Sequence, residues 1–563
     1  MGGGAPDLRG APTRTLARMV PDHGVLDPET DPLATLVLEP DDLRTLASRV
    51  ASSPEAGTRT HHAPWTGAPL ASLPQSTAAD VASAARRARA AQRRWAAVPA
   101  RDRGRLLLRV HDLLLSRQSD VLDLVQLENG KARAAAFEEV ADVAILARHL
   151  GLRAPAYLAD ERRPGLVPGL TRIRVQHDPV GVVGVVAPWN YPLSLTLGDV
   201  LPALAAGDAV LLRPDPQTPL TALWAVELLE DAGMPAGLVQ VVLGDGPTVG
   251  AAVVDHVDHL VFTGSTATGR VVAARAAERL VPSTLELGGK NALYVADDVD
   301  VEVAAEGAVR ACFGGTGQLC VSAERLYVHE AVADAFAAAL ARRARALRVG
   351  TGLDYRADVG SLTSAEQLAR VVEHVEDALS GGARVLAGGL HRPDLGPYVY
   401  EPTVLEGVGE HARAYRDETF GPVVALSRVA SDDEAVAAVN DSGYGLHASV
   451  WSGSARRGAA LAARLRAGSV SVNEGYQASW GSVAAPQGGR GASGWGARHG
   501  REGLLALTAT RTVAVQRGVH GLRVAGRRVL PPVGLGRVLS GPPERWTADV
   551  TAVLRAARRL RLR

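Results

Sequence analysis

The chain has 563 residues, of which 47% are hydrophobic and 21% charged, and its formal net charge is +1. This length allows roughly two to four domains with large cores, and the balanced charge gives no indication of a nucleic-acid or membrane-surface partner. The only two cysteines, Cys312 and Cys320, are too few for a disulfide framework, which favours a reducing compartment such as the cytoplasm.

The first part of the chain changes in character near residue 36. Residues 1–35 are rich in Gly, Pro and Asp, carry no signal-peptide pattern and predict a flexible leader. Helical spacing of apolar residues follows, with Thr77 at the start of one helix and Pro99 just past its end. The pattern predicts helices at 41–50, 77–95, 102–127 and 134–150.

From Gly181 onward the pattern alternates between strands and helices. Apolar runs predict strands at 181–187, 209–212, 238–243 and 259–263, with helices at 197–206, 220–232 and 247–254 between them. Such alternation predicts a doubly wound, mostly parallel sheet with right-handed crossovers. A second α/β unit is expected from Glu286 to about Val472.

The tail after Arg517 is rich in arginine and proline. Apolar residues from Trp546 to Leu560 recur at helical spacing and predict a basic amphipathic helix. Packing against its own subunit is the favoured interpretation, and binding to a membrane or an acidic partner is the alternative.

Cys320, in the run Gly317-Gln318-Leu319-Cys320, is the candidate nucleophile. A catalytic thiol needs positive potential from backbone amides or a nearby cation, and the glycines before it can expose such amides. The alternative is a small buried hydrophobic residue, which is the interpretation given to Cys312.

Two further polar residues complete the candidate site. Glu286 opens the run Glu-Leu-Gly-Gly-Lys, where a carboxylate at a strand end can face a cleft, or can pair with Lys290 instead. Asn190, in Ala-Pro-Trp-Asn-Tyr-Pro, follows the strand 181–187 at the place where open α/β sheets bind ligands, or is a turn-forming Asn. A thiol, a carboxylate and a carboxamide are the groups needed to oxidise a carbonyl through a thioester.

A nucleotide site is expected where the strand 259–263 runs into Gly264-Ser-Thr-Ala-Thr-Gly269. Small residues allow the backbone to approach a pyrophosphate, and the next helix presents free N–H groups. The competing turn at 244–250 carries Asp245, which would repel phosphate, so we interpret it as structural. No histidine or acidic cluster has a metal-ligand spacing, and no metal is expected.

These motifs in this order resemble the aldehyde dehydrogenase superfamily. The resemblance extends from about Trp65 to about Gln516 and includes Phe-Thr-Gly-Ser-Thr, Glu418-Thr-Phe-Gly-Pro422 and residues 486–503. Within the superfamily the chain looks most like the actinobacterial succinate-semialdehyde dehydrogenase group, notably in Arg213-Pro-Asp-Pro-Gln-Thr and Gly-Gly-Thr-Gly-Gln-Leu-Cys-Val.

The resemblance implies an α/β, aldehyde-dehydrogenase-like fold with two doubly wound α/β domains and a small β oligomerisation flap. The nucleotide-binding domain would comprise 36–164 and 179–285, and the catalytic domain 286–480. The flap would comprise 165–178 and 508–516, followed by an Arg-rich extension at 518–563. A homodimer or homotetramer is implied.

The resemblance also implies roles for individual residues. Cys320 would attack the aldehyde, Asn190 and the Cys320 N–H would stabilise the oxyanion, and hydride would pass to NAD(P). Glu286 would then activate the water that hydrolyses the thioester. The implied cofactor contacts are Trp189, Arg213, Asp215, Pro216, Gly264, Ser265, Leu287, Glu418 and Phe420.

Cofactor and substrate selection rest on a few departures from the family pattern. Pro216 stands where NAD-preferring relatives can carry a ribose-binding glutamate, which favours NADP with NAD usable, although Asp215 points the other way if it faces the ribose. Gly198 and Gly314 stand where characterised succinate-semialdehyde enzymes carry carboxylate-binding arginines. Either another basic residue serves, or the substrate has no carboxylate.

Succinate semialdehyde is therefore the leading substrate, and a general aliphatic or aromatic aldehyde is the alternative. An acylating enzyme that passes the thioester to coenzyme A or phosphate is a further alternative, but such relatives commonly lack the glutamate seen at Glu286. A non-enzymatic relative would be expected to have lost Cys320 or Asn190, and both are present.

Overall fold

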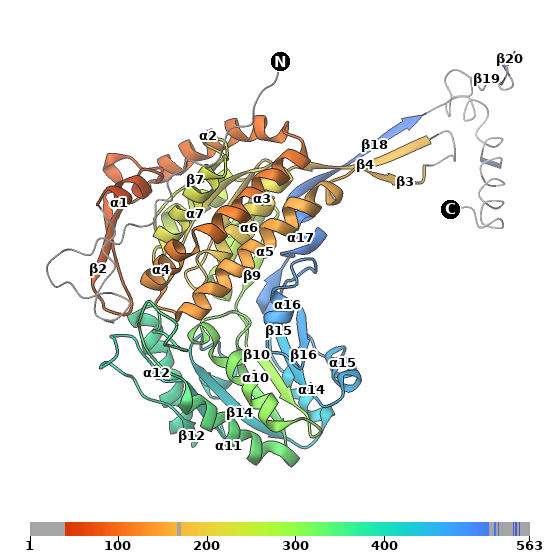
Figure 1. Ribbon diagram of the computed structural model, residues 1–563. Coiled ribbons are helices and arrows are strands. Elements are labelled where there is room, and N and C mark those ends of the chain that lie inside the picture. The colour runs from red at the N-terminus through yellow and green to blue at the C-terminus, as the bar shows by residue number, and fades with distance from the viewer. Residues whose placement is uncertain are drawn as a thin grey trace. The chain divides into compact units, whose positions relative to one another are not determined.

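The computed structural model describes residues 40–165 and 171–516, and beyond them only 523–524, 527–528, 544, 547–548, 551 and 555. The predicted leader at 1–35 lies outside the described residues, as does most of the predicted extension at 518–563. The chain divides into two compact units, one of Met1–Pro155 with Val180–Leu507 and one of Ala156–Pro179 with Thr508–Arg563. Figure 1 shows the chain coloured by residue number.

The first unit contains a six-stranded sheet in the order β17-β9-β8-β5-β6-β7. Neighbouring strands from β9 to β7 are parallel, and the short β17 is antiparallel to β9. The central strands are buried along their whole length, which explains their continuous apolar sequences. The bounds are β5 (Val182–Val186), β6 (Ala209–Arg213), β7 (Val239–Val241), β8 (His259–Gly264), β9 (Ser283–Leu287) and β17 (Gly494–Trp495).

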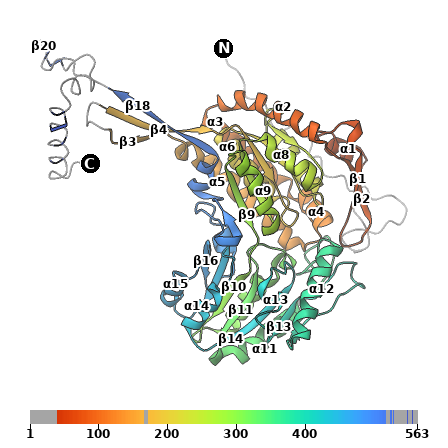
Figure 2. The ribbon, with the colours of Figure 1, turned by 180° about the vertical axis from the view of Figure 1, so that it is seen from behind.

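Helices cover both faces of this sheet, as Figures 1 and 2 show from opposite sides. On one face α2 packs against β5, β6 and β7 and against α8, which in turn packs against α9. On the other face α6 packs against α3 and α7, and α7 packs against α4. The bounds are α2 (Ala78–Ala96), α3 (Ala100–Ser116), α4 (Gln118–Asn129), α6 (Ser194–Ala206), α7 (Pro219–Asp231), α8 (Ala251–His256) and α9 (Thr266–Glu278).

Smaller elements complete this part of the first unit. Helix α1 (Pro40–Ala47) is followed by the turn η1 (Pro54–Ala56) and the antiparallel pair β1 (Thr58–His62) and β2 (Pro69–Pro74). Helix α5 (Arg133–Tyr157) leads toward the second unit, and η2 (Gly246–Gly250) precedes α8.

The predicted doubly wound α/β arrangement is confirmed, with two local corrections. The single helix expected at 102–127 is wrong, because Arg117 leaves helical geometry between α3 and α4. Its guanidinium there forms ion pairs with Asp120, Glu227 and Asp231. The helix expected after Gly269 instead begins at Thr266, where the Ser265 side chain caps it by accepting a hydrogen bond from Thr268 N.

A seven-stranded sheet follows in the order β12-β13-β14-β11-β10-β15-β16, parallel except for β12 at one edge. Successive residues of β10 face opposite sides of the sheet. Leu293 and Val295 join the core under α10 (Val301–Phe313) and α11 (Glu330–Ala346), and Tyr294 joins the core under α14 (Asp432–Asn440) and α15 (Ala455–Ala462). The strands are β10 (Asn291–Val295), β11 (Ala323–His329), β12 (Arg384–Ala387), β13 (Thr403–Glu406), β14 (Val423–Val429), β15 (His447–Trp451) and β16 (Ser469–Val472).

The remaining elements of the first unit flank this second sheet or return toward the first one. They are α10 (Val301–Phe313), η3 (Gly314–Gly317), α11 (Glu330–Ala346), α12 (Ala365–Ser380), α13 (Arg413–Arg416), α14 (Asp432–Asn440), α15 (Ala455–Ala462), α16 (Gln477–Trp480), η4 (Gly491–Ser493) and α17 (Gly500–Ala506). The segment that returns to the first sheet forms β17 at its edge, and this places Gly494 opposite Glu286 of the site.

The second unit contains a three-stranded antiparallel sheet in the order β18-β4-β3. Strand β4 (Thr171–Pro179) pairs with β18 (Thr508–Gln516) along its full length, from Thr508 opposite Pro179 to Gln516 opposite Thr171. Strand β3 (Glu161–Arg163) pairs with the other edge of β4. Strands β4 and β18 fall in the two segments predicted for the oligomerisation flap, 165–178 and 508–516, whereas β3 lies just before the first of them. The short pair β19 (Arg523–Val524) and β20 (Arg527–Arg528) comes later in the chain.

Candidate active site

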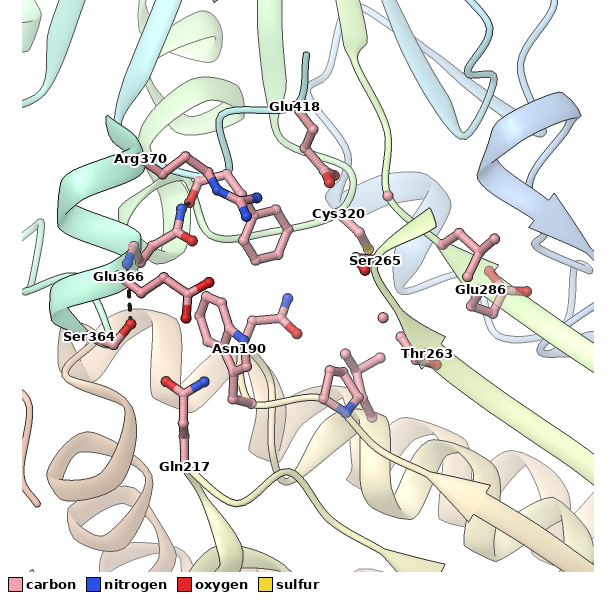
Figure 3. Close-up of a pocket in the computed structure, with 18 residues that line it drawn as sticks. Asn190, Gln217, Thr263, Ser265, Glu286, Cys320, Ser364, Glu366, Arg370 and Glu418 are labelled. Carbon is pink, nitrogen blue, oxygen red and sulfur yellow. Dashed lines mark hydrogen bonds between the residues drawn. The ribbon is translucent and has the colours of Figure 1, made fainter. Parts of the chain in front are cut away.

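A cleft of about 280 Å³ lies beyond the carboxyl ends of β5 and β8, the position at which open α/β sheets bind ligands. Figure 3 shows its lining, with Glu286 at one end and Gln217, Glu366 and Arg370 at the other. All three candidate catalytic residues line it: Cys320, Glu286 and Asn190. Of the expected cofactor contacts, it is lined by Trp189, Gly264, Ser265, Leu287, Glu418 and Phe420.

Cys320 lies at the end of a tightly turned loop. Gly315, Thr316 and Gly317 in succession have positive φ angles of 58°, 62° and 69°, a conformation that is costly for Thr. Thr316 is held in it by the hydrogen bond that its Oγ1 accepts from Gly360 N. A Cβ at Gly317 would lie 2.2 Å from the main-chain oxygen of Gly421. Only glycine therefore fits this close approach.

Cys320 is half-buried as a residue, whereas Cys312 is buried, and both are free. Burial raises the pKa of the Cys320 thiol to about 12, and the positive charge of Arg498 is the largest influence that lowers it. Asn291 Nδ2 donates to the main-chain oxygen of Cys320 at 2.6 Å and fixes the peptide that carries the thiol. Cys312 belongs to the apolar core of the second sheet, as its sequence context predicts.

Asn190 is buried and fixed at both its main chain and its side chain. Its Nδ2 donates to the main-chain oxygen of Gln318 at 2.9 Å, which ties it to the loop that carries Cys320. Its main-chain oxygen accepts hydrogen bonds from Lys131 Nζ at 2.6 Å and from Asn129 Nδ2 at 3.3 Å. Since an amide nitrogen carries two hydrogens, the second one of Asn190 remains for a ligand.

Lys131 is itself buried and forms an ion pair with Glu139 at 2.6 Å. The other oxygen of Glu139 accepts from the N–H groups of Leu193 and Ser194 at the start of α6, which satisfies donors that a helix start leaves free. Lys131 is one of only two lysines in the chain, and its sequence context predicted no role for it in the site.

Glu286 lies on β9, in register with Thr263 of β8 and opposite Gly494 of β17. Its Oε1 is buried and makes no hydrogen bond with any residue that the structure describes. Burial raises the pKa of this carboxyl to about 7, and the charge of Arg498 opposes the rise. The expected alternative, an ion pair with Lys290, is wrong because Lys290 pairs with Glu324 instead.

Arg498 and Asp199 lie beside these residues and were missed in the sequence. Arg498 Nε and Nη2 donate to the two carboxylate oxygens of Asp199 at 2.9 and 2.7 Å. Both side chains are buried. Asp199 lies on α6, far from Arg498 in the sequence, so only the folded structure reveals that the two residues are paired.

The expected nucleotide cradle has the geometry of an anion site. Gly264 ends β8, Ser265 caps α9, and the N-terminus of this thirteen-residue helix faces the cleft that both residues line. On another wall the rings of Trp189 and Phe420 meet edge to face, with centroids 5.4 Å apart. These groups offer free N–H donors to a pyrophosphate and flat apolar faces to a ring.

Glu418 lies against the Glu-Leu-Gly-Gly-Lys run. Its Oε1 accepts from Gly289 N at 2.8 Å, and a Cβ at Gly288 would lie 2.3 Å from its Oε2. The neighbouring peptides are held by Glu324, which accepts from the N–H groups of Thr419 and Phe420. Glu324 is paired in turn with Lys290. Both lysines of the chain therefore stabilise loops that line the cleft.

Arg213, Asp215 and Pro216 are not among the residues that line the cleft. Arg213 ends β6, and its Nη2 and Nε donate to the main-chain oxygen of Gly244 at 2.8 and 3.2 Å. Asp215 accepts from Gln217 N at 2.9 Å. Asp245 caps the turn at 246–250 through Thr248 N, a structural use that matches its interpretation from the sequence.

Cys320 and Trp480 pack against an apolar cluster that contains Tyr191, Leu195, Leu319, Val321, Leu446 and Tyr476. The Tyr476 hydroxyl donates to Glu138 at 3.1 Å, and it occupies the space that a side chain at Gly314 would need. Buried Gly198 has open space where its Cβ would lie. This wall is therefore mainly aromatic and aliphatic.

The described residues contain neither a metal-binding cluster nor a membrane-spanning helix. Within 40–165, 171–516 and the short pieces beyond, no group of three or more His, Cys, Asp or Glu residues could hold a metal ion. Over the same residues, every helix is too short or too polar to span a bilayer.

Comparison with known proteins supports one family. Residues 51–513 match the model of the aldehyde dehydrogenase family. A Mycolicibacterium smegmatis protein named "Putative succinate-semialdehyde dehydrogenase", NADP(+), is 47% identical over 496 residues, which cover 88% of this chain and 93% of that protein. Glutarate-semialdehyde dehydrogenase of Pseudomonas aeruginosa is 37% identical over 78% of this chain and 90% of its own length.

A solved structure gives the same answer. The crystal structure of succinate-semialdehyde dehydrogenase from Burkholderia pseudomallei superposes with a TM-score of 0.79 at 35% identity, covering 83% of this chain and 96% of the other. The chain belongs to the aldehyde dehydrogenase family.

Proposed function

We propose that the protein oxidises succinate semialdehyde to succinate with NADP⁺ as the hydride acceptor, through a thioester on Cys320. The observation that carries the chemistry is one cleft, beside the N-terminus of α9, that is lined by a thiol, a carboxamide and a carboxylate whose Oε1 makes no hydrogen bond with any described residue. The substrate and the cofactor are supported by relatives named for succinate semialdehyde and NADP(+).

In the proposed reaction the Cys320 sulfur attacks the aldehyde carbon and forms a thiohemiacetal. The second N–H of the Asn190 carboxamide and the Cys320 N–H stabilise the oxyanion, a contribution of about 3–4 kcal/mol per donor in comparable sites. NADP⁺, when bound, would supply the acceptor for the hydride that leaves the substrate carbon, and loss of that hydride from the thiohemiacetal gives a thioester on Cys320. Glu286 then accepts a proton from the water that attacks this thioester.

The residues present fit a dinucleotide. Gly264 and Ser265 at the start of α9 would hold the pyrophosphate of the dinucleotide. Trp189, Leu287 and Phe420 would pack against the dinucleotide and its rings. Glu418 would accept from a ribose hydroxyl. Arg213, Asp215 and Pro216 would lie at the adenine ribose, and Arg213 could meet a 2′-phosphate.

The aldehyde itself is tested by a panel assay with both cofactors. Succinate and glutarate semialdehyde should give a higher kcat/KM than straight-chain and aromatic aldehydes of similar length. If an uncharged aldehyde exceeds succinate semialdehyde by more than about tenfold, equivalent to about 1.4 kcal/mol in transition-state binding, the substrate assignment fails.

A second candidate is an uncharged aliphatic or aromatic aldehyde. It is favoured by the cluster of Tyr191, Leu195 and Tyr476 near Cys320 and by the glycines at 198 and 314, where arginines would bind a distal carboxylate. Transfer of the acyl group to coenzyme A is less well supported, because Glu286 is present and its Oε1 makes no hydrogen bond with any described residue.

We also propose that the protein acts as a homodimer or homotetramer and works in the cytoplasm. The pairing of β4 with β18 leaves a sheet of the kind used for assembly in this family. Both cysteines are free, and the chemistry requires Cys320 to stay reduced. Light scattering with size-exclusion chromatography would measure the assembly directly.

A further inference from the structure

Arg498 is a buried arginine fixed from two sides. Besides its two bonds to Asp199, its Nη2 donates to Thr263 Oγ1 at 2.8 Å. Thr263 is in register with Glu286 on the neighbouring strand. The guanidinium is therefore held beside the strand that carries Glu286, while its Nη1 makes no hydrogen bond with any residue that the structure describes.

Arg498, Glu286 and Cys320 line one small cavity. It offers about 20 Å³ for water, which is enough for one molecule and too little for a substrate. Glu286 Oε1, which lacks a partner among the described residues, belongs to the same lining. The cavity thus brings together a cation with a free donor, a carboxylate with a free acceptor, and the thiol.

We propose that Arg498, fixed by Asp199, is a positioning residue for deacylation that holds the Glu286 carboxylate and the water it deprotonates. The inference rests on the thioester chemistry of the proposed function but not on which aldehyde is oxidised. Nothing in the sequence suggested it, since arginine is the common basic residue throughout this chain.

Hydrolysis of the thioester proceeds in one balanced step. Arg498 Nη1 donates to the water oxygen, and the water proton passes to Glu286. The water oxygen bonds to the acyl carbon, and the carbon–sulfur bond breaks with its electron pair on Cys320. The acid product loses its own proton to solvent. Arg498 lines the same cavity as Cys320, and its positive charge, which lowers the pKa of the thiol, would also stabilise the thiolate that is released.

The charged groups around this cavity have opposite effects on the pKa of Glu286. Arg498, from the segment before α17, lowers the pKa of Glu286, and Asp199 on α6 raises it. Cys320 faces the same cavity, and Arg498 also influences Asp142 on α5 and the buried His499. Substitutions of Arg498 and Asp199 should therefore shift the pH dependence in opposite directions.

The test uses the full-length enzyme with whichever aldehyde of the panel it oxidises fastest. Rapid mixing gives the burst of reduced cofactor, steady-state assays give kcat, and intact-protein mass spectrometry detects acylated Cys320. Arg498→Gln removes the positive charge. Arg498→Lys keeps the positive charge but loses the pair of hydrogen bonds to Asp199. Asp199→Asn removes the negative charge and keeps Arg498. Arg490→Gln, at an exposed arginine of the same segment, is the matched control.

Arg498→Gln should keep a near-stoichiometric burst and accumulate acyl enzyme, while kcat falls about tenfold to hundredfold, within the range that general base catalysis contributes. The acidic limb of its kcat profile should move to higher pH, and that of Asp199→Asn to lower pH. Arg498→Lys should recover part of kcat with the limb near its original position. Hydroxylamine, which attacks a thioester without a general base, should restore turnover in Arg498→Gln.

The proposal is overturned if the burst of Arg498→Gln falls in parallel with its kcat. It is also overturned if the acidic limbs of the kcat profiles of Arg498→Gln and Asp199→Asn both stay at their original pH. If Arg498→Gln melts below the assay temperature, Asp199→Asn and Arg498→Lys carry the same test, since the first removes only the negative charge of the pair and the second keeps both charges while losing the paired hydrogen bonds to Asp199. Failure of the substrate assignment would change which aldehyde is fastest and would leave these shifts intact.

Discussion

Lys131 Nζ donates to the main-chain oxygen of Asn190 at 2.6 Å, so a buried ammonium fixes the peptide of the candidate oxyanion donor. The same ammonium pairs with Glu139, whose other oxygen accepts from the start of α6. One ion pair therefore fixes the position of the loop that follows β5 and of the first turn of α6.

Replacing Lys131 with Met should cost about 3–5 kcal/mol of unfolding free energy, because Glu139 is left buried and uncompensated. It should also lower kcat/KM, since Asn190 loses a main-chain anchor. Urea unfolding and steady-state kinetics measure the two effects. The double variant Lys131→Met/Glu139→Gln should recover stability without recovering activity; recovery of both would show that Lys131 has no role in the position of Asn190.

The two cysteines should respond differently to substitution. Cys320→Ser should abolish formation of reduced cofactor, because a hydroxyl is a far weaker nucleophile than a thiolate. Cys312→Ser buries a hydroxyl in the core of the second sheet, so it should lower stability by about 1–3 kcal/mol while most activity remains. Activity and thermal melting distinguish the two outcomes. Equal loss of activity in both variants would contradict the assignment of Cys320 as nucleophile.

The strand–helix alternation predicted the first sheet because both faces of a parallel sheet are buried, which leaves a continuous apolar run for each strand. The break at Arg117 was not predictable, because its cause is a set of ion pairs with Glu227 and Asp231 more than a hundred residues away. Local spacing carries no information about such partners.

The same limit applies to the site. Cys320, Glu286 and Asn190 stand in short runs whose glycines and aromatic residues are visible in the sequence, and all three line one cleft. Arg498 and Asp199 carry no such signal, since arginine is abundant and an aspartate on a helix is ordinary. Their pairing depends on the return of residues 494–498 to the edge of the first sheet.

Glu286→Gln should separate acylation from deacylation. Glutamine has nearly the same shape but cannot accept the proton of water, so hydride transfer should continue for one turnover and hydrolysis should stall. Rapid mixing should show a stoichiometric burst followed by a kcat lower by about 10²- to 10⁴-fold. If burst and steady state fall equally, Glu286 acts before the thioester forms.

The pH dependence follows from the burial of Glu286. Burial raises its pKa to about 7, and a base must be ionised to accept a proton. Deacylation should therefore be slow in acid, rise as pH increases through about 7, and level off above it. The pKa of Cys320, raised to about 12 by burial, adds a further rise of kcat/KM toward alkaline pH. A kcat profile that is flat from pH 6 to 8, with deacylation limiting, would contradict the role of Glu286.

Arg213 offers the last test, of cofactor choice. Its Nε and Nη2 are bonded to Gly244 O, and Asp215 and Asp245 are the acidic groups that influence its pKa. A 2′-phosphate carries about 1.5 to 2 negative charges at neutral pH, and a bond to a charged partner contributes about 1.5–3 kcal/mol. Arg213→Gln should therefore raise KM for NADP about tenfold to hundredfold. KM for NAD should change far less, because NAD lacks that phosphate.

Asp215→Asn is the matched variant, since it removes a negative charge next to Arg213 and keeps the shape of the side chain. It should lower KM for NADP relative to NAD if Asp215 faces the ribose. Steady-state kinetics with both cofactors give the ratio for each variant. Because Arg213 also holds the Gly244 turn, an equal rise in KM for NAD and NADP would mean that its contribution is to that turn alone, and NADP selection would have to come from another cation.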